Sequence, residues 1–260
     1  MIVLTIAGSD SSAGAGIQAD LKTIAANGCY GASVITTITS QNTEGVSDIY
    51  DLPISVVESQ FEAVVRDLDV KFVKIGMLSS CEIIQSVDTL LKKSKIPYIL
   101  DPVMSAKDST KLLKNEAVEM MKNSLLKEAF LITPNIPEAE VLTGMTIETI
   151  EDMKEACLKL DAQNVLLKGG HLLGDNLVDI LYHEGKFFEY KHHKIQSQNT
   201  HGTGCTLASA ITSQLALGST LSYACENAIE YVQKAIVNNY SIGLGQSPLN
   251  HFFMLEDAYA

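Results

Sequence analysis

Short apolar runs alternate along the chain with segments in which apolar residues recur at helical spacing. The runs rich in Val, Ile, Leu and Thr cover residues 2–7, 32–39, 71–75, 98–100, 130–132 and 165–167. Between two of them, Val57, Phe61, Val64 and Leu68 repeat every three or four residues. This alternation is typical of βαβ units, so the pattern predicts an α/β fold built on a mostly parallel sheet.

The remaining pattern predicts further helices and one edge hairpin. A helix is expected over residues 16–27, with Gly28 in the position that closes a helix, and another with Pro53 at its first position. Residues 177–195, with a turn at Glu184-Gly185, predict an antiparallel hairpin at the sheet edge, followed by helices over 203–217 and 221–238. No linker or repeat interrupts the pattern, which favours one domain over residues 1–260.

Polar, glycine and proline residues follow the predicted strands. The segments after four of them read GMLSS, DPVMSAKDS, TPNIPE and KGGH. In open parallel sheets, ligands bind outside the carboxyl ends of the strands, where these loops converge. The pattern therefore predicts a binding site at this edge of the sheet.

Composition narrows the partners that such a site could serve. The 260 residues include 31 acidic and 19 basic ones, for a formal net charge of −12. This balance argues against nucleic acid or an anionic membrane as a partner. A polyphosphate could still bind through local groups such as backbone amides, a lysine or a divalent cation. The first ten residues, MIVLTIAGSD, lack a basic segment and predict a strand instead of a signal peptide, and no apolar run is long enough to span a bilayer. Five scattered cysteines without a C-x-x-C pair favour a cytoplasmic protein without structural zinc.

The first glycine-rich loop spans residues 8–20 and reads GSDSSAGAGIQAD. No Gly-Lys-Ser/Thr follows, so it is not a Walker A loop, and Ala19 replaces the last glycine of a dinucleotide-binding fingerprint. A tight connection between strand and helix is one interpretation. The concentration of polar side chains, among them Asp10, Gln18 and Asp20, favours a role in binding.

Gln41 and Asn42 follow the second predicted strand. A side-chain amide offers a donor and an acceptor together, which suits a heteroaromatic ring bearing an amine beside a ring nitrogen. A polar turn is the alternative.

Two carboxylates and a lysine lie at further strand ends. Asp101 and Glu138 fit Mg²⁺, which takes oxygen ligands and usually retains several waters while it bridges phosphates. For Glu138 the alternative is a first-turn residue that complements the helix dipole. Lys168 could neutralise a phosphate or could simply be solvated.

Two histidine-containing segments carry less weight. His171 has no metal partner in the pattern and is interpreted as structural. The run Lys191-His192-His193-Lys194 is interpreted as a solvated strand face, because no third ligand lies at useful spacing.

The segment NTHGTGCT places Cys205 directly behind Gly202 and Gly204, where an alanine-rich helix is expected to begin. Glycines permit tight turns and close approach of the backbone to a ligand. A helix start attracts anions and lowers the pKa of a thiol. A buried core cysteine is the alternative for such a residue taken alone.

Together these motifs resemble one family. GSDSSAGAGIQADLKT, SQNTEGV, KIGML, DPVM, TPNIPEAEVL, KGGH and NTHGTGC occur in the order found in bacterial hydroxymethylpyrimidine/phosphomethylpyrimidine kinases of thiamine biosynthesis, within the ribokinase-like superfamily. Ribokinase-like enzymes carry G-x-G-D at the last motif, with the Asp as general base. The resemblance therefore implies that Cys205 occupies the position of the catalytic acid/base.

The resemblance also implies a fold and a reaction. The fold is a three-layer α/β/α sandwich, and the reaction transfers the γ-phosphoryl group of ATP to 4-amino-5-hydroxymethyl-2-methylpyrimidine and then to its monophosphate. On this basis Gly202, Thr203 and Gly204 form an anion hole beside Cys205. Gln41, Asp20, Ala15 and Met77 line the pyrimidine pocket. Lys168, Thr203 and Asn135 contact ATP or its phosphates, while Asp101 and Glu138 act on Mg²⁺, directly or through water.

Four further expectations accompany the resemblance. A pyridoxal or pyridoxine kinase of the same sub-family is the nearest alternative, and a pyrimidine sensor without catalysis is another. A homodimer is expected from the resemblance alone. Many relatives have Gly where Ala13 stands, so this residue is expected to adopt a negative φ or to be mildly strained.

Overall fold

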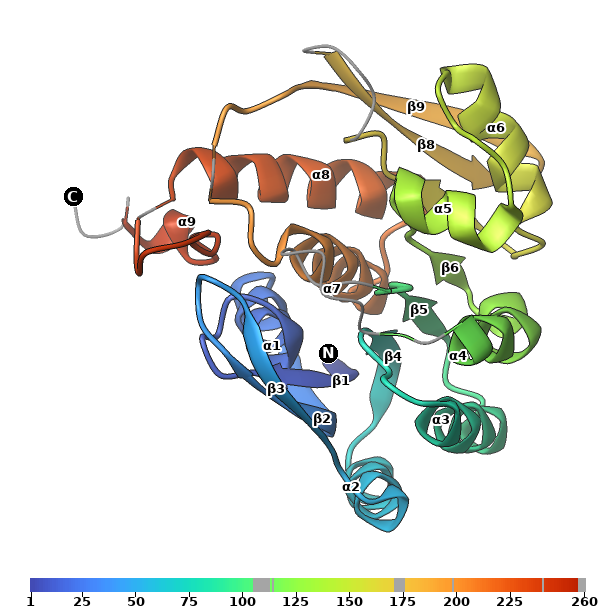
Figure 1. Ribbon diagram of the computed structural model, residues 1–260, viewed down its shortest axis with the longest axis vertical. Helices are drawn as coiled ribbons and strands as arrows, with labels where there is room; N and C mark the ends of the chain where they lie inside the picture. Colours follow the sequence, from blue (N-terminus) through green and yellow to red (C-terminus); the bar gives the residue numbers. More distant parts are fainter. Residues whose placement is uncertain (105–112, 114, 171–175, 198, 240, 257–260) are drawn as a thin grey trace.

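The computed structural model describes residues 1–104, 113, 115–170, 176–197, 199–239 and 241–256 (Figure 1). Within these residues a nine-stranded sheet has the order β3-β2-β1-β4-β5-β6-β7-β8-β9. The strands are β1 (Ile2–Asp10), β2 (Tyr30–Gln41), β3 (Val46–Asp51), β4 (Val70–Ile75), β5 (Tyr98–Leu100), β6 (Leu131–Ile132), β7 (Val165–Leu167), β8 (Asn176–His183) and β9 (Lys186–His193).

The middle of the sheet is parallel and both of its edges are antiparallel. Strands β2, β1, β4, β5, β6 and β7 pair in parallel. β8 and β9 form the predicted hairpin, which pairs antiparallel with β7. The antiparallel strand β3 at the other edge was not predicted from the sequence. Because the parallel strands share one direction, their carboxyl ends and the loops that follow lie along the same edge of the sheet.

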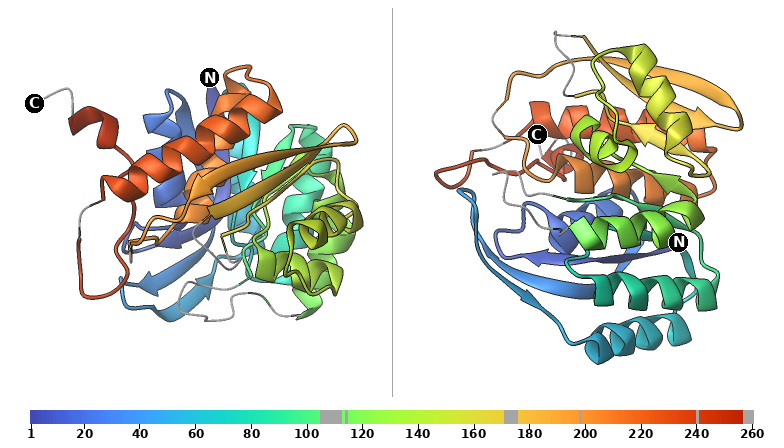
Figure 2. Two further views of the ribbon diagram at one scale, coloured as in Figure 1. Left: turned by 90° about the horizontal axis from the view of Figure 1, so that it is seen from above. Right: turned by 45° about the vertical axis from the view of Figure 1, so that its right-hand side comes forward.

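Helices cover both faces of the sheet, so the expected α/β/α layering is confirmed (Figures 1 and 2). One layer contains α2 (Ile54–Asp67), α3 (Cys81–Ser94), α4 (Asn115–Met121) with a π-helical turn (Lys122–Leu126), α5 (Ile136–Thr143) and α6 (Ile150–Lys159). The other contains α1 (Gly16–Ala26), α7 (Thr203–Ala216) and α8 (Leu221–Val237), and a short helix α9 (Phe253–Glu256) follows. Within the described chain, no helix combines the length and hydrophobicity needed to cross a bilayer.

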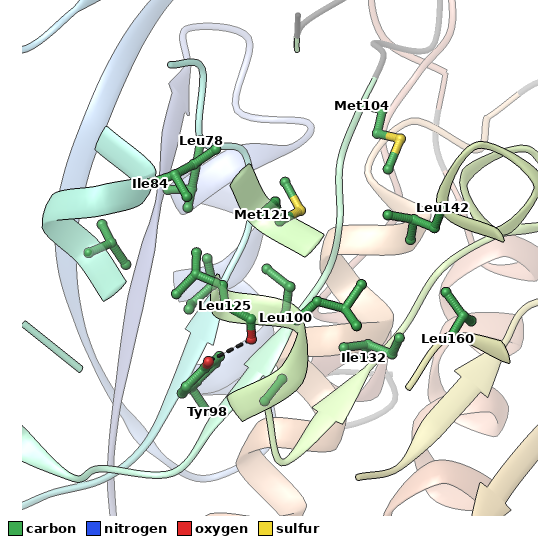
Figure 3. Packing of buried hydrophobic residues seen from close by; sticks show 14 of the residues in the cluster. Leu78, Ile84, Tyr98, Leu100, Met104, Met121, Leu125, Ile132, Leu142 and Leu160 are labelled. Carbon is green, nitrogen blue, oxygen red and sulfur yellow. Dashed lines mark hydrogen bonds between the residues drawn. The ribbon is translucent and has the colours of Figure 1, made fainter. Parts of the chain in front are cut away.

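Alternate residues of the central strands pack into the two helical layers. In β5, Leu100 packs in the core shared with α2 to α6, whereas Ile99 packs against α7 and α8. Figure 3 shows part of the first core, where the hydroxyl of Tyr98 donates a 2.6 Å hydrogen bond to the carbonyl of Leu125. Burying one such aliphatic side chain stabilises the fold by about 1.5–3 kcal/mol, which explains why these strands are continuous apolar runs in the sequence.

Local signals set most element boundaries close to the expected positions. Gly28 has φ of 78° directly after the Asn27 cap of α1, as expected for a residue that closes a helix. Pro53 is the N-cap of α2 and not its first helical residue, because its ψ of 139° is extended. β1 continues three residues beyond the predicted end, so Gly8, Ser9 and Asp10 belong to the strand that leads into the glycine-rich loop.

Candidate active site

A cavity of about 850 Å³ lies at the carboxyl ends of the parallel strands. Its wall is formed by the ends of β1, β2 and β4 and by the segments that follow β1, β4, β5, β6 and β7. The first turn of α7 and parts of α8, β8 and β9 complete it. Of the twelve site residues expected from the sequence, all except Asp20 line this cavity: Ala15, Gln41, Met77, Asp101, Asn135, Glu138, Lys168, Gly202, Thr203, Gly204 and Cys205. The cavity therefore lies at the edge of the sheet where the sequence pattern predicted a binding site.

The start of α7 packs tightly against the glycine-rich loop. Gly202 caps the helix with a left-handed φ of 83°, and a Cβ atom there would collide with the carbonyl oxygen of Gly14. At Gly204 a Cβ atom would lie 3.4 Å from Asp101 Oδ2 and 3.5 Å from Lys168 Nζ. The first amides of α7, which have no partner within the helix, thus lie next to a charged pair at the cavity wall.

Cys205 is half-buried and lines the cavity, so the interpretation of this residue as a core cysteine is wrong. Burial raises the pKa of its thiol to about 11, although Lys74 and the backbone N–H of Gly16 act in the opposite direction. The expectation that the helix start lowers this pKa is therefore wrong, because desolvation outweighs the favourable charges.

Lys168 and Asp101 form a buried ion pair. Lys168 Nζ lies 3.1 Å from Asp101 Oδ1, and the hydroxyl of Thr133 donates to the same oxygen at 3.1 Å. Burial by itself disfavours the ammonium, but Asp101 and Glu138 hold the pKa of Lys168 above its ordinary value. Lys168 is consequently a fixed cation in the cavity wall and not a solvated surface lysine.

Glu138 and Asn135 form the capping box of α5. Asn135 Oδ1 accepts the backbone N–H of Glu138 at 2.9 Å, and Glu138 Oε2 accepts that of Asn135 at 2.8 Å. Burial and, to a smaller extent, Asp101 raise the pKa of Glu138, whereas Lys168 opposes the shift. The helix-capping alternative for Glu138 is thus correct, and it places a second carboxylate beside Asp101 and Lys168.

These carboxylates are not arranged as a complete metal site. Within the described residues, no group of three or more His, Cys, Asp or Glu side chains could hold a metal ion. One oxygen of Asp101 is bonded to Lys168 and Thr133, and one oxygen of Glu138 to a backbone amide. The other oxygens fit a cation that keeps its water and takes phosphate ligands, as Mg²⁺ commonly does.

Gln41, Met77 and Ala15 mark another part of the cavity. Gln41 is the last residue of β2, and its backbone N–H and carbonyl both bond to the hydroxyl of Ser11, at 2.8 and 2.7 Å. The glycine-rich loop therefore fixes the position of Gln41 at the end of β2. The polar-turn alternative holds for Asn42, whose Oδ1 accepts the backbone N–H groups of Glu44 and Gly45.

Asp20 does not line the cavity, so the expectation that it lines the pyrimidine pocket is wrong. It is fully buried beneath the cavity, where it pairs with Lys74 at 2.9 Å and accepts hydrogen bonds from Thr5 and Ser209. Lys74 was missed by sequence reasoning, although it is fully buried and lines the cavity. The available signal was a lysine inside the otherwise apolar end of a strand.

The polar residues of the glycine-rich loop mainly hold the loop together. Asp10 accepts the backbone N–H groups of Ser12, Gly14 and Ala15 at 2.8–3.1 Å. Ala13 adopts a φ of 62°, so the strained alternative of the expectation applies and the negative φ does not.

The basic segment at the end of β9, residues 191–194, is only partly solvated. Lys191, His193 and Lys194 are exposed, but His192 is half-buried and its Nε2 lies 3.1 Å from Asp179 Oδ2. The interpretation of the whole segment as a solvated face is thus wrong for His192. His171 lies outside the described residues.

Known proteins match this chain over most of its length. The family model described as phosphomethylpyrimidine kinase matches residues 10–250. The chain belongs to this family. A hydroxymethylpyrimidine/phosphomethylpyrimidine kinase of Bacillus subtilis is 44% identical, with 96% of this chain and 94% of that protein covered. A thiamine biosynthesis bifunctional protein, ThiED, of Geobacter sulfurreducens is 48% identical over 98% of this chain, which spans about half (53%) of that protein's length.

Solved structures agree with the fold. A phosphomethylpyrimidine kinase from Clostridium difficile is 48% identical and has a TM-score of 0.81, covering 91% of this chain and 99% of that chain. A pyridoxal kinase from Staphylococcus aureus, in complex with AMP-PCP and pyridoxal, is 36% identical with a TM-score of 0.89, covering 96% and 93%. The ribokinase-like kinase fold implied by the sequence motifs is confirmed by these matches.

Proposed function

We propose that this phosphomethylpyrimidine kinase family member transfers the γ-phosphoryl group of ATP to the hydroxymethyl group of 4-amino-5-hydroxymethyl-2-methylpyrimidine, and then phosphorylates the resulting monophosphate. The observation that carries the proposal is the single cavity in which the Gln41 amide, the start of α7 at Gly202 to Cys205, and Lys168 all lie. A flat aminopyrimidine and a polyphosphate can both be held there, with the reacting hydroxyl between them.

Binding and charge stabilisation account for most of the expected catalysis, since phosphoryl transfer needs little covalent help from the protein. The first amides of α7 would donate to the oxygens of the transferring group, with Gly202 and Gly204 permitting the close approach. Lys168 would neutralise phosphate charge, and Thr203 and Asn135 border the same space.

Cys205 has two chemically distinct roles open to it. With a pKa raised to about 11, its side chain is mainly a protonated thiol near pH 7. As a general base it acts through the thiolate, so kcat rises about tenfold per pH unit toward pH 11. As a donor from S–H to phosphoryl oxygens, it gives a kcat that is flat with pH and declines only near pH 11. A pH profile of kcat separates the two roles.

Asp101 and Glu138 would hold Mg²⁺ through its water molecules, consistent with their partly used oxygens. When bound, the cation supplies positive charge that offsets the negative charge of the phosphates. The residues of this chain orient the nucleotide: Lys168 remains paired with Asp101, and Asn135 fixes Glu138 through the cap of α5.

The test is a coupled ATP-consumption assay with hydroxymethylpyrimidine, its monophosphate and pyridoxal, each with and without Mg²⁺. We expect Mg²⁺-dependent turnover of both pyrimidines and a higher kcat/KM for hydroxymethylpyrimidine than for pyridoxal. Tight binding of the pyrimidine without ATP turnover would instead support a sensor.

Pyridoxal kinase activity is a second candidate because solved pyridoxal kinases superpose closely on this chain, with TM-scores of 0.88–0.90. Pyridoxal lacks the exocyclic amine that a glutamine amide can recognise beside a ring nitrogen. A kcat/KM that favours pyridoxal would reverse the substrate assignment.

We further propose that the protein acts in the cytoplasm as a homodimer. The cytoplasmic location is supported by the five cysteines, all of which are free in the structure, because disulfides are rare in a reducing compartment. The homodimer follows from the family resemblance alone. Cell fractionation and light scattering test these two proposals separately.

A further inference from the structure

His201 lies between two polar side chains at the Gln41 end of the cavity. Its Nε2 atom is 2.9 Å from Asp10 Oδ2 and 3.2 Å from the side-chain amide nitrogen of Gln41. Asp10 and His201 are almost fully buried, and all three residues line the cavity. His201 Nε2 is therefore within hydrogen-bond distance of both Asp10 and Gln41.

Asp10 determines that this ring nitrogen carries a proton. Its carboxylate also accepts the hydroxyl of Ser12 and three backbone N–H groups of the glycine-rich loop. Burial opposes the charge, yet these donors and His201 hold the pKa of Asp10 below its ordinary value. An ionised carboxylate can only accept hydrogen bonds, so Nε2 of His201 must be the donor.

The proton on His201 restricts the orientation of the Gln41 amide. An N–H group of Gln41 pointing at a protonated Nε2 would bring two donors together without an acceptor. Turning the amide by 180° exchanges its nitrogen and oxygen at nearly the same positions and presents the oxygen to Nε2–H. His201 Nε2–H then faces an acceptor, the amide oxygen of Gln41.

Thr39 is compatible with the turned amide. Its hydroxyl oxygen lies 3.1 Å from the other terminal atom of Gln41 and 3.0 Å from the carbonyl oxygen of Ser9. The hydroxyl has one proton, which the Ser9 carbonyl can accept, leaving its oxygen to accept from the amide nitrogen. Asp10, His201, Gln41, Thr39 and Ser9 then form one continuous chain of hydrogen bonds, in which the single Nε2 proton of His201 is shared between Asp10 Oδ2 and the Gln41 amide oxygen.

We infer that His201, held by Asp10, is a specificity-positioning residue that fixes the Gln41 amide with its oxygen toward His201 and its nitrogen toward Thr39. The backbone of Gln41 is already held by Ser11, so the amide orientation is the main freedom left to this side chain. This inference rests on the proposed function, since it names how the same site selects its ring.

The fixed amide makes the order of donor and acceptor on the ligand matter. A 4-aminopyrimidine offers an N–H donor beside a ring-nitrogen acceptor, whereas its 4-oxo counterpart offers an oxygen acceptor beside a ring N–H. The hydroxymethyl group has to reach the start of α7, so the ring cannot turn over to restore the match. A site with a fixed donor–acceptor order should therefore reject the 4-oxo ring.

The experiment measures Kd by calorimetry, without ATP, for 4-amino-5-hydroxymethyl-2-methylpyrimidine and for its 4-oxo counterpart. We expect the wild-type protein to prefer the amino ring by about 100-fold or more, and His201→Leu to reduce this ratio by about tenfold or more. His201→Gln should restore the preference, because its amide nitrogen is as many bonds from the backbone as Nε2. Ser12→Ala is the matched control: it removes a different donor from Asp10 and should leave the ratio unchanged.

Thr39→Val, which is nearly isosteric, gives a second test if His201→Leu does not fold. It removes the other partner of the amide and should also lower the ratio. An unchanged ratio in the folded variants, or equal binding of the two rings by the wild-type protein, overturns the inference. The proposed function fails separately, through absence of ATP turnover, and the binding ratio still decides the role of His201 in that case.

Discussion

Charged side chains around the cavity are held by partners from distant parts of the chain. Lys168 pairs with Asp101, 67 residues away, and Asp10 with His201, 191 residues away. Such pairs reduce the number of conformations that must be ordered when substrate binds. The site is in this sense preorganised by the fold.

The sharpest prediction for a single residue concerns Cys205. Cys205→Ala should lower kcat by about 10²–10⁴, the usual contribution of a positioned acid or base, and should change the KM for the pyrimidine little. Steady-state kinetics of the purified variant measure this. Cys81→Ala, at the start of α3 and outside the cavity lining, is the control and should behave as wild type. Wild-type turnover by Cys205→Ala would remove the thiol from the chemistry.

Single residues also show which features of the site can be predicted from the sequence and which cannot. Gln41 and Lys168 could be placed at the cavity because polar residues at the ends of apolar strands share one edge of a parallel sheet. Cys205 was placed there by the glycines before an expected helix start and by the family resemblance. The roles of Lys74, Asp20 and His201 depend on which side chains meet across the fold, and spacing along the chain does not contain that information. The pKa of Cys205 was predicted in the wrong direction, because the degree of desolvation is a property of tertiary packing.

At the scale of elements, the glycine-rich loop and the start of α7 interlock. Gly202 has to be glycine for two separate reasons: its φ is 83°, and a side chain would collide with the Gly14 carbonyl. Next to it, a Cβ at Gly14 would collide with the ring of His201. Two segments far apart in the sequence thus depend on close backbone contact.

Two glycine substitutions distinguish backbone strain at a positive φ from the collision of a new side chain with Gly14. Gly202→Ala should destabilise the protein by about 2–3 kcal/mol and abolish most activity, because the start of α7 has to move away from Gly14. Gly218→Ala has a similar positive φ of 95° but no atom within 4 Å of the new Cβ, so it should cost only about 1 kcal/mol and keep its kcat. Urea unfolding and steady-state rates test both. Equal losses in the two variants would show that backbone strain alone matters.

Helices and strands were predicted correctly where burial produces a pattern of apolar residues in the sequence. The parallel strands are buried on both faces and appear as apolar runs. β3 was missed because its residues are nearly all exposed, so no alternation marks it as a strand. Its position is set by pairing with β2, for example between Thr39 and Ile49, and that pairing is a tertiary property.

For the whole molecule, one buried network joins elements from both ends of the chain. Lys74 of β4 pairs with Asp20 of α1, and Asp20 also binds Thr5 of β1 and Ser209 of α7. Ser209 is one helical turn from Cys205, so this network lies directly below the end of α7 that lines the cavity. Removing one charge of the pair should therefore affect the stability of the entire fold.

Lys74→Met should destabilise the protein by about 3–5 kcal/mol, because it leaves the Asp20 carboxylate buried and unpaired. The double variant Lys74→Met/Asp20→Asn should recover much of this loss, since no unpaired charge remains. Lys71→Met, on the same strand but in an exposed pair with Asp69, should change stability by less than about 1 kcal/mol. Urea denaturation at neutral pH provides all three values. A double variant as unstable as Lys74→Met alone would contradict the unpaired-charge explanation.

Acid stability depends on a second buried group, His251. It is 1% exposed, its Nε2 lies 3.1 Å from the Thr206 hydroxyl, and burial, with the nearby Lys22 charge, lowers its pKa to about 3. Below pH 6.5 the unfolded chain protonates this histidine while the folded protein does not, so stability falls as pH decreases from 6.5 toward 3.

The contribution of His251 to this loss should be about 1.4 kcal/mol per pH unit. His251→Asn should be less stable than wild type at pH 7, since a buried contact with Thr206 is altered, but its stability should fall less steeply with acid. His193→Asn, on the exposed side of β9, should keep the wild-type slope. Urea unfolding at pH 7, 6, 5 and 4.5 gives the three curves. Parallel curves for wild type and His251→Asn would show that the acid sensitivity arises elsewhere, for example at Asp10, whose charged form the fold also stabilises.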